Sequence, residues 1–354
     1  MFMTEKNKRG ISLAYSDLEA KPQLAHDAEA AGFDLIWNSG ESIPLFGSIA
    51  KTTNTTPFGS GVIRAFAHDI RELAQSSVDL QRLSDNRFIL GLGGGTKRMN
   101  INQLGKEFDH PATRLREMIK GLKIAWATPY NEDMDFHGKY YSLAGKGLRG
   151  VISDSGLAGL GGEATNTPPE PALIYLAAVN KAMFRLAGDL CDGLCGHPIA
   201  SVRFINEIAW PSIDEGLNRS NRTREDFDHN AWIVTAISSD EKQAEREAKL
   251  HIARFMATRS YAIILDSQGY SDVREKVQEA FFQTPNDIDA LIDAVPDEIA
   301  REHSIYGNID QVREQAQKYE GVVNTSTFYC ASALMSHERI HENIKLMIEA
   351  FGKN

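Results

Sequence analysis

The feature that most constrains the fold of this chain is a series of eight short apolar runs. Each run is followed by a helix or by a gap long enough for one. The runs cover residues 10–15, 33–37, 59–66, 87–93, 172–179, 192–197, 231–238 and 325–331. Apolar residues recur at helical spacing in residues 22–31, 69–83, 109–126, 181–187, 241–256, 308–319 and 337–351. Repeated strand–helix units in this number favour an α/β fold, a parallel (β/α)8 TIM barrel, over an open sheet.

Two stretches do not fit this alternation. Residues 128–170 hold GKGLRG, GLAGLGGE and TNTPPEP, a glycine- and proline-rich composition that is typical of an insertion or a lid. Residues 258–305 hold helical fragments beyond those that eight units need. Because both stretches lie between strand–helix units, we expect a single TIM-barrel domain over residues 1–354 with these two insertions.

Charge and composition exclude several classes of partner. The formal net charge is −10, which repels the phosphate backbone of nucleic acids. The chain has no apolar run of about 20 residues that could span a membrane, and its first residues lack the apolar segment of a signal peptide. Three cysteines, an odd and sparse number, favour reduced thiols. We therefore expect a cytoplasmic protein with neither nucleic-acid nor membrane partners.

The stretch RFILGLGGGTKRMN, residues 87–100, leads an apolar run into four glycines and then into cations. In a barrel, ligands bind at the loops that follow the carboxyl ends of the strands. Thr96 stands where a dinucleotide fingerprint, or a P-loop ending at Lys97, would require glycine, so neither motif is complete. Two interpretations stay open, a glycine-rich loop that contacts an anion through backbone N–H groups and a purely structural turn.

The segment HERIH, residues 337–341, matches the zinc-binding pattern HExxH. On a helix its two histidines would share one face, with Glu338 as the base. However, Ile340, Ile344 and Met347 mark an ordinary amphipathic helix that packs on a core. We therefore expect no metal site.

Four longer segments together resemble the luciferase-like monooxygenase superfamily, and the resemblance extends over most of the chain. The segments are SGVIRAFAHDIRELAQSSVDLQRLSDNRFILGLGGG (60–95), HPATRLREMIKGLKIAW (110–126), PEPALIYLAAVNKAMFRLAGDLCDG (169–193) and GNIDQVREQAQKYEGVV (307–323). The LGLG strand end with a lysine a few residues beyond it is more similar to the members that use the deazaflavin coenzyme F420, such as methylenetetrahydromethanopterin reductase, than to the FMN monooxygenases.

The resemblance implies where the coenzyme binds. Members carry a non-proline cis peptide in the third strand against the deazaflavin ring, and the matching bond here is Gly61–Val62. The glycine loop would lie near the coenzyme's side chain and phosphate, and a second backbone segment would follow the fifth strand. The implied coenzyme-binding residues are Ser39, Gly61, Val62, Arg64, Gly93, Gly94, Gly95, Thr96, Lys97, Ala177, Ala178, Asn180 and Lys181.

The sequence departs from the family at its acid–base positions. Many relatives carry an Asp-His or Glu-His pair after the second strand, where this chain has Ser39 and Gly40. Some F420 enzymes place a glutamate in the glycine loop, at the position of Thr96. Glu41 and His68, in loops that we expect after strands, are the candidate catalytic replacements, although a solvated Glu41 and a structural His68 remain alternatives.

The resemblance implies an oxidoreductase that transfers hydride between F420 and a small organic substrate. The alternative within the superfamily is an FMNH2-dependent two-component monooxygenase, which needs a flavin reductase as partner. Because the usual acid–base residues are absent, a non-catalytic flavin- or F420-binding protein is the alternative of another class. A homodimer is a family expectation.

Overall fold

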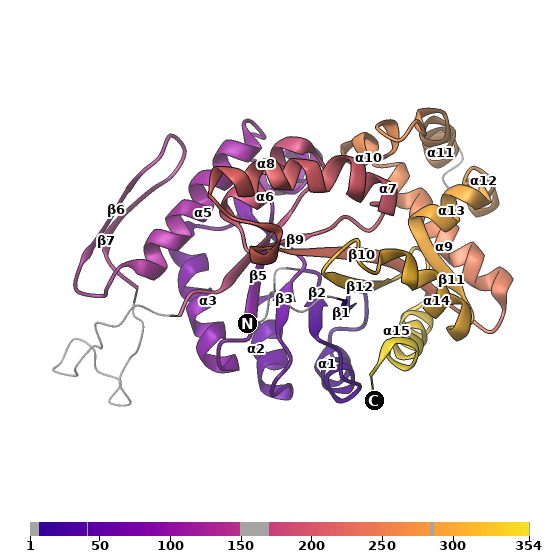
Figure 1. Ribbon diagram of the computed structural model, residues 1–354, viewed down its shortest axis with the longest axis horizontal. Coiled ribbons are helices and arrows are strands. Elements are labelled where there is room, and N and C mark those ends of the chain that lie inside the picture. Colours follow the sequence, from indigo (N-terminus) through magenta and orange to yellow (C-terminus); the bar gives the residue numbers. More distant parts are fainter. Residues whose placement is uncertain (1–6, 41, 149–169, 284–286, 354) are drawn as a thin grey trace.

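The computed structural model describes residues 7–40, 42–148, 170–283 and 287–353 (Figure 1). Parallel strands run in the order β10-β12-β1-β2-β3-β5-β8-β9, and β10 also pairs with β9, so that the sheet closes on itself. The eight barrel strands are β1 (Lys8–Ser12), β2 (Leu35–Asn38), β3 (Phe58–Ser60), β5 (Phe88–Gly93), β8 (Leu173–Ala177), β9 (Gly193–Cys195), β10 (Asp228–Ile237) and β12 (Thr325–Cys330). The TIM barrel expected from the sequence is confirmed, and each strand lies within or overlaps one of the eight apolar runs.

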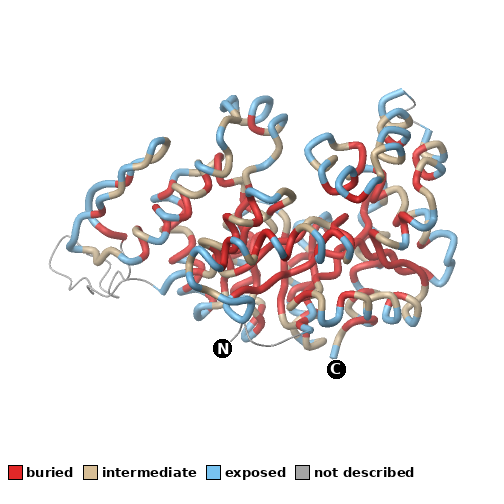
Figure 2. Tube along the Cα trace, turned by 45° about the horizontal axis from the view of Figure 1, so that its top comes forward, coloured by how far each residue is buried: buried red, intermediate tan, exposed pale blue. Residues whose placement is uncertain are grey.

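Helices surround the barrel and bury their apolar faces against it (Figures 1 and 2). The expected helices are present, and α3 begins after Asp69, whose side chain accepts from the backbone N–H groups of Arg71 and Glu72. Two of the gaps also hold helices, α2 and α8. The bounds are α1 (Lys21–Ala30), α2 (Ile43–Thr52), α3 (Ile70–Ser84), α5 (Pro111–Ala127), α6 (Lys181–Leu190), α8 (Trp210–Arg219), α9 (Glu241–Met256), α14 (Ile309–Ala316) and α15 (His337–Phe351).

The first stretch expected to be an insertion contains a hairpin that projects beside the barrel (Figure 1). Its antiparallel strands are β6 (Asp133–His137) and β7 (Ser142–Lys146). After the hairpin, the structure describes only residues 147–148 and 170 of that stretch. The proposed role as a lid therefore stays a prediction.

The second such stretch forms helices packed near α9, together with a strand that the sequence did not predict. The helices are α10 (Ala262–Asp266), α11 (Ser271–Gln283), α12 (Ile288–Asp293) and α13 (Asp297–His303). The added strand, β11 (Ser304–Gly307), pairs with the carboxyl half of β10, beyond the residues that pair with β9. Short elements complete the described structure: β4 (Ile63–Arg64), α4 (Lys97–Leu104), α7 (Val202–Phe204), η1 (Ala65–Ala67), η2 (Ile205–Ala209), η3 (Arg224–Asp226), η4 (Arg259–Tyr261) and η5 (Gln317–Tyr319).

A buried polar cluster fills the amino-terminal end of the barrel. Lys8 Nζ lies 3.1 Å from a carboxylate oxygen of Asp228, and both side chains are buried. The hydroxyls of Tyr175 and Thr325 donate to the same carboxylate at 2.8 and 2.9 Å. Because Lys8, Asp228 and Thr325 each begin a strand, this network closes one end of the barrel and leaves the carboxyl end for a ligand.

Candidate active site

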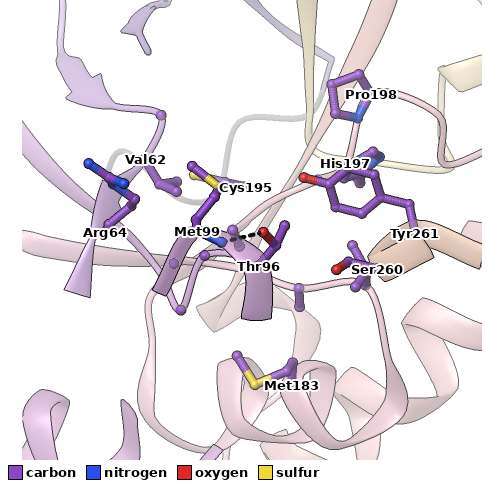
Figure 3. Close-up of a pocket in the computed structure, with 18 of the residues that line it drawn as sticks. Val62, Arg64, Thr96, Met99, Met183, Cys195, His197, Pro198, Ser260 and Tyr261 are labelled. Carbon is purple, nitrogen blue, oxygen red and sulfur yellow. Dashed lines mark hydrogen bonds between the residues drawn. The ribbon is translucent and has the colours of Figure 1, made fainter. Parts of the chain in front are cut away.

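A cavity of about 570 Å3 opens at the carboxyl ends of the strands (Figure 3). Its walls come from the loops after the first, second, third, fourth, fifth and sixth barrel strands, from α6, from β10 and β12, and from the segment that follows α9. This is the end of a TIM barrel where binding sites occur, and the volume suits a small organic molecule or coenzyme.

A cis peptide bond joins Gly61 and Val62, as the resemblance implied. It separates β3 from β4, and the Gly61 N–H donates to the Asn38 carbonyl at 2.8 Å. A Cβ atom on Gly61 would lie 2.2 Å from the Trp232 ring. Glycine at position 61 is therefore required for the indole to approach the strand so closely.

The break between β3 and β4 at Gly61–Val62 also explains why the LGLG strand end has glycine at positions 91 and 93. A Cβ on Gly91 would lie 1.8 Å from the Ser60 carbonyl oxygen, and one on Gly93 would lie 2.7 Å from Val62. The Ser60 side chain bridges the interrupted ladder, since its Oγ donates to the Gly91 carbonyl and accepts from the Gly91 N–H, both at 2.9 Å. These glycines let β3 and β4 lie against β5 at the cavity floor.

The glycine loop ends in a helix that begins at the cavity. Gly95 has φ +66°, the left-handed region that favours glycine. Thr96 caps α4, because its Oγ1 accepts from the Met99 N–H at 3.2 Å (Figure 3). Asn100 Nδ2 donates to the carbonyls of Gly94 and Thr96 at 2.8 and 2.9 Å and fixes the loop. The positive end of the α4 dipole thus lies at the cavity.

A second helix begins at the same cavity. Asn180 Oδ1 accepts from the Met183 N–H at 3.1 Å and caps α6. Ala177, Ala178 and Asn180 line the cavity with backbone and small side chains. Two helix N-termini therefore meet one cavity, an arrangement suited to an anionic group.

Most residues named from the resemblance meet at this cavity. Those that line it are Ser39, Gly61, Val62, Arg64, Gly93, Gly94, Gly95, Thr96, Lys97, Ala177, Ala178 and Asn180. Lys181 is exposed on the first turn of α6 and is not among the lining residues.

Of the two catalytic candidates, only His68 lies in the described part of the structure. His68 is not a lining residue, and its Nδ1 lies 3.1 Å from a Glu72 carboxylate oxygen. Its Nε2 is buried and has no hydrogen-bond partner. Glu41 lies outside the described residues.

An aromatic wall that sequence reasoning did not find closes one end of the cavity. It consists of Tyr15, His197, Trp232, Phe255, Tyr261 and Tyr329. Tyr15 and His197 follow the first and sixth barrel strands, a position that could have singled them out. Phe255 and Tyr261 come from the end of α9 and from η4, where no pattern in the sequence points to a site.

The rings of this aromatic wall form a continuous series. The centroids of His197 and Tyr261 lie 4.0 Å apart, and those of His197 and Phe255 lie 5.0 Å apart. Phe255 packs on Tyr329 at 6.4 Å, and Tyr329 packs on Trp232 at 5.4 Å. Since Trp232 lies against Gly61, the wall begins beside the cis peptide and ends at Tyr261.

Burial shifts the pKa of three groups in the wall toward the uncharged form. It lowers the pKa of His197 to about 3, so the imidazole is neutral near pH 7. Burial also raises the pKa of both tyrosines that face each other across Phe255, Tyr261 and Tyr329. At neutral pH this end of the cavity therefore presents rings and neutral polar groups.

Two buried polar atoms of lining residues have no hydrogen-bond partner. They are Trp232 Nε1 and Ser39 Oγ. A buried donor without a partner is unfavourable by about 1–3 kcal/mol, so such atoms mark places where a ligand could complete the hydrogen bonding. Together with the close-packed glycines, they fit a planar ring that carries polar atoms at its edge.

The HERIH segment lies outside the lining of this cavity. The HERIH segment forms the start of α15, with His337 and Glu338 exposed. Within the described ranges, no three His, Cys, Asp or Glu side chains are grouped so that they could hold a metal ion. Nor does any helix in this part of the chain have the length and apolar character needed to cross a membrane.

Comparisons with known proteins agree with this geometry. The chain is 29% identical over 335 residues to a Mycobacterium tuberculosis protein provisionally named a coenzyme F420-dependent oxidoreductase, covering 88% of this chain and 92% of that protein. The fold of this chain is similar to that of coenzyme F420-dependent tetrahydromethanopterin reductase from Methanopyrus kandleri. The TM-score is 0.76 at 19% identity, covering 98% of this chain and 99% of that one.

A flavin enzyme shares the fold as well. The oxygenating constituent of 3,6-diketocamphane monooxygenase from Pseudomonas putida, in complex with FMN, superposes with a TM-score of 0.66 at 15% identity, covering 99% of this chain and 97% of that one. The family model for luciferase-like monooxygenases matches residues 1–325. This chain therefore belongs to the luciferase-like monooxygenase family.

Proposed function

We propose that the protein is an oxidoreductase that uses coenzyme F420 to transfer hydride to or from a small organic substrate. One observation carries the proposal: two capped helix N-termini, those of α4 and α6, meet the cavity floor at Gly61–Val62 in a single site. Two similar proteins whose names state that they depend on F420 also support it.

The residues present fit such a coenzyme. The N–H groups of α4 and α6 and the side chains of Arg64 and Lys97 would bind its anionic tail, against the net charge of −10. Trp232 Nε1 and Ser39 Oγ would bond the polar edge of its ring. When bound, the deazaflavin supplies the hydride chemistry.

The chain's own contribution is then to orient and to exclude water. Good positioning contributes about 7–11 kcal/mol to lowering a barrier. The glycines of the LGLG strand end bring the backbone close, and the aromatic wall covers the space beside Gly61. We expect Glu41, His68 or water to handle the proton, as the sequence suggested.

The second candidate is an FMNH2-dependent monooxygenase with a separate flavin reductase. The FMN complex of the monooxygenase supports this candidate, because its fold is similar over 99% of this chain. A non-catalytic flavin- or F420-binding protein is the third. For any of the three we expect a cytoplasmic homodimer.

Titration of the purified protein with F420, FMN and anaerobically reduced FMN distinguishes the candidates. We expect F420 to bind and to be reduced or oxidised with a substrate from a panel of alcohols and carbonyl compounds. Preferred binding of reduced FMN with oxygen uptake would instead assign the monooxygenase. Binding of either coenzyme with no turnover across the panel would assign the non-catalytic protein.

A further inference from the structure

We propose that the aromatic wall binds an uncharged, largely apolar substrate with one carbonyl or hydroxyl oxygen, and that Tyr261 determines this specificity by hydrogen-bonding that oxygen. The inference rests on the proposed function, because it takes the coenzyme to lie on the other side of Gly61–Val62. It concerns the end of the cavity formed by His197, Phe255 and Tyr261.

The distribution of charge in the cavity carries the first step. Its cationic lining residues are Arg64 and Lys97, which belong to the end formed by the glycine loop and β4. The described lining residues include no aspartate or glutamate. A charged substrate group beside His197, Phe255 and Tyr261 would lose its hydration without gaining an opposite charge from the lining, which is strongly unfavourable.

The rings carry the second step. A substrate beside His197 and Phe255 meets flat apolar faces whose centroids are 5.0 Å apart, and the imidazole is neutral. Such a surface favours an alicyclic or aromatic skeleton through area and edge contacts. Arg254 lies beside the wall, with its guanidinium 5.8 Å from the Tyr15 ring centroid, but it is not among the residues that line the cavity. A sugar phosphate or another multiply charged molecule at His197, Phe255 and Tyr261 would therefore find no cation and no dense set of hydrogen-bond partners in the lining.

The hydroxyls carry the third step. In Figure 3 the hydroxyl groups of Tyr261 and Ser260 point from their segment toward the side of the cavity lined by Thr96 and Met99. The structure gives neither hydroxyl a hydrogen-bond partner within the described chain. The ring of Tyr261 is held against His197 at 4.0 Å, so its hydroxyl is presented in a fixed position. One neutral oxygen on the substrate would satisfy it.

A set of ligands with one skeleton and different charge tests the proposal. Cyclohexanone, cyclohexanol, cyclohexanecarboxylate and cyclohexylammonium are compared by ligand-observed NMR, both with and without saturating F420. We expect the two neutral ligands to bind at least about tenfold more tightly than either ion. Equal or tighter binding of an ion, or no binding of the neutral ligands in either condition, would overturn the inference. Failure of F420 itself to bind would instead overturn the proposed function.

Two variants test the role of the hydroxyls. Tyr261→Phe keeps the ring packed against His197 and should weaken cyclohexanone binding about two- to tenfold, the range for losing one hydrogen bond, while F420 binding stays unchanged. Tyr130→Phe, outside the cavity lining, is the matched control and should change neither.

A variant that gains affinity for an anion tests the charge argument without relying on a loss of binding. Ser260 is exposed at the rim of this end, so Ser260→Arg can be accommodated and should reverse the preference toward cyclohexanecarboxylate. An unchanged preference in Ser260→Arg, or equal loss in Tyr261→Phe and Tyr130→Phe, would contradict the assignment.

Discussion

Gly61 has no space for a side chain on the face that meets Trp232, where a Cβ would approach ring carbons at 2.2 and 2.5 Å. Gly61→Ala should therefore displace the indole and lower the free energy of unfolding by about 1–3 kcal/mol, the usual range for overpacking. It should also weaken coenzyme binding, because Trp232 forms part of the cavity. Urea unfolding and coenzyme titration measure the two effects.

Gly94 is the matched control for this residue. A Cβ there would meet Phe66 and Leu115 at 3.4 and 3.5 Å, which is ordinary van der Waals contact, so Gly94→Ala should stay within about 0.5 kcal/mol of the parent. Adding Trp232→Phe to Gly61→Ala should restore part of the stability. Equal stability of the two alanine variants would refute the close-approach argument.

At the level of single residues, the sequence predicted one side of the site and missed the other. Gly61 and Gly93 could be found because a family pattern fixes where the backbone must come close. Tyr261 could not, since it reaches the cavity from η4, a segment after α9 whose path depends on how it packs against α9 and α10. Nothing in the spacing of Phe255 and Tyr261 distinguishes them from ordinary core residues.

At the scale of elements, α4 and α3 each begin at a residue whose side chain caps the helix, but only the cap of α4 lies at the cavity. Removing each cap therefore tests whether an effect on coenzyme binding goes beyond an effect on stability. Thr96→Ala removes the acceptor of the Met99 N–H and should cost about 1 kcal/mol. Because Thr96 also lines the cavity, F420 affinity should fall about tenfold, with calorimetric titration as the measurement. Thr96→Ser should restore both.

Asp69→Ala provides the comparison within the same fold. It removes the cap of α3, where the carboxylate accepts from the Arg71 N–H at 2.8 Å, and should reduce stability by a similar amount. Asp69 lies outside the cavity lining, so coenzyme affinity should not change. A parallel loss of affinity in both variants would show that α4 acts only through overall stability.

The barrel elements follow the sequence because each strand overlaps an apolar run and most strand residues are buried, as in β10, where all ten residues are buried. The strand β11 was not expected, because its pairing partner is the far half of β10 and no local pattern reports that contact. The helix α4 was missed for a related reason, since its eight residues, KRMNINQL, bury only Asn100 and show no apolar stripe.

At the scale of the whole molecule, the two ends of the barrel have different tasks. Lys8 and Asp228 pair inside the amino-terminal end and link β1, β8, β10 and β12 through shared hydrogen bonds. A buried charge pair of this kind is strongly unfavourable to break, because the remaining partner stays unpaired. The carboxyl end can then keep unpaired polar atoms such as Trp232 Nε1 for a ligand.

Acid should destabilise the molecule through three histidines whose pKa values burial lowers to about 3: the buried His229 and His251, and the half-buried His197. In the unfolded chain each histidine takes up a proton below about pH 6.5, whereas the folded chain does not until about pH 3. Their stabilisation is therefore complete above pH 6.5 and is lost as the pH falls toward 3, by about 1.4 kcal/mol per pH unit for each histidine well below 6.5.

His229→Phe tests this linkage, because His229 packs edge-on against Trp210 at 4.8 Å and its Nδ1 has no hydrogen-bond partner. Between pH 5.5 and 4.5 the urea-derived free energy of unfolding should fall less steeply in this variant, by about 1.4 kcal/mol per pH unit. His337→Ala, at an exposed position on α15, should keep the parent slope. Identical slopes in all three proteins would mean that His229 is protonated in the folded state, and the burial argument would fail for this residue.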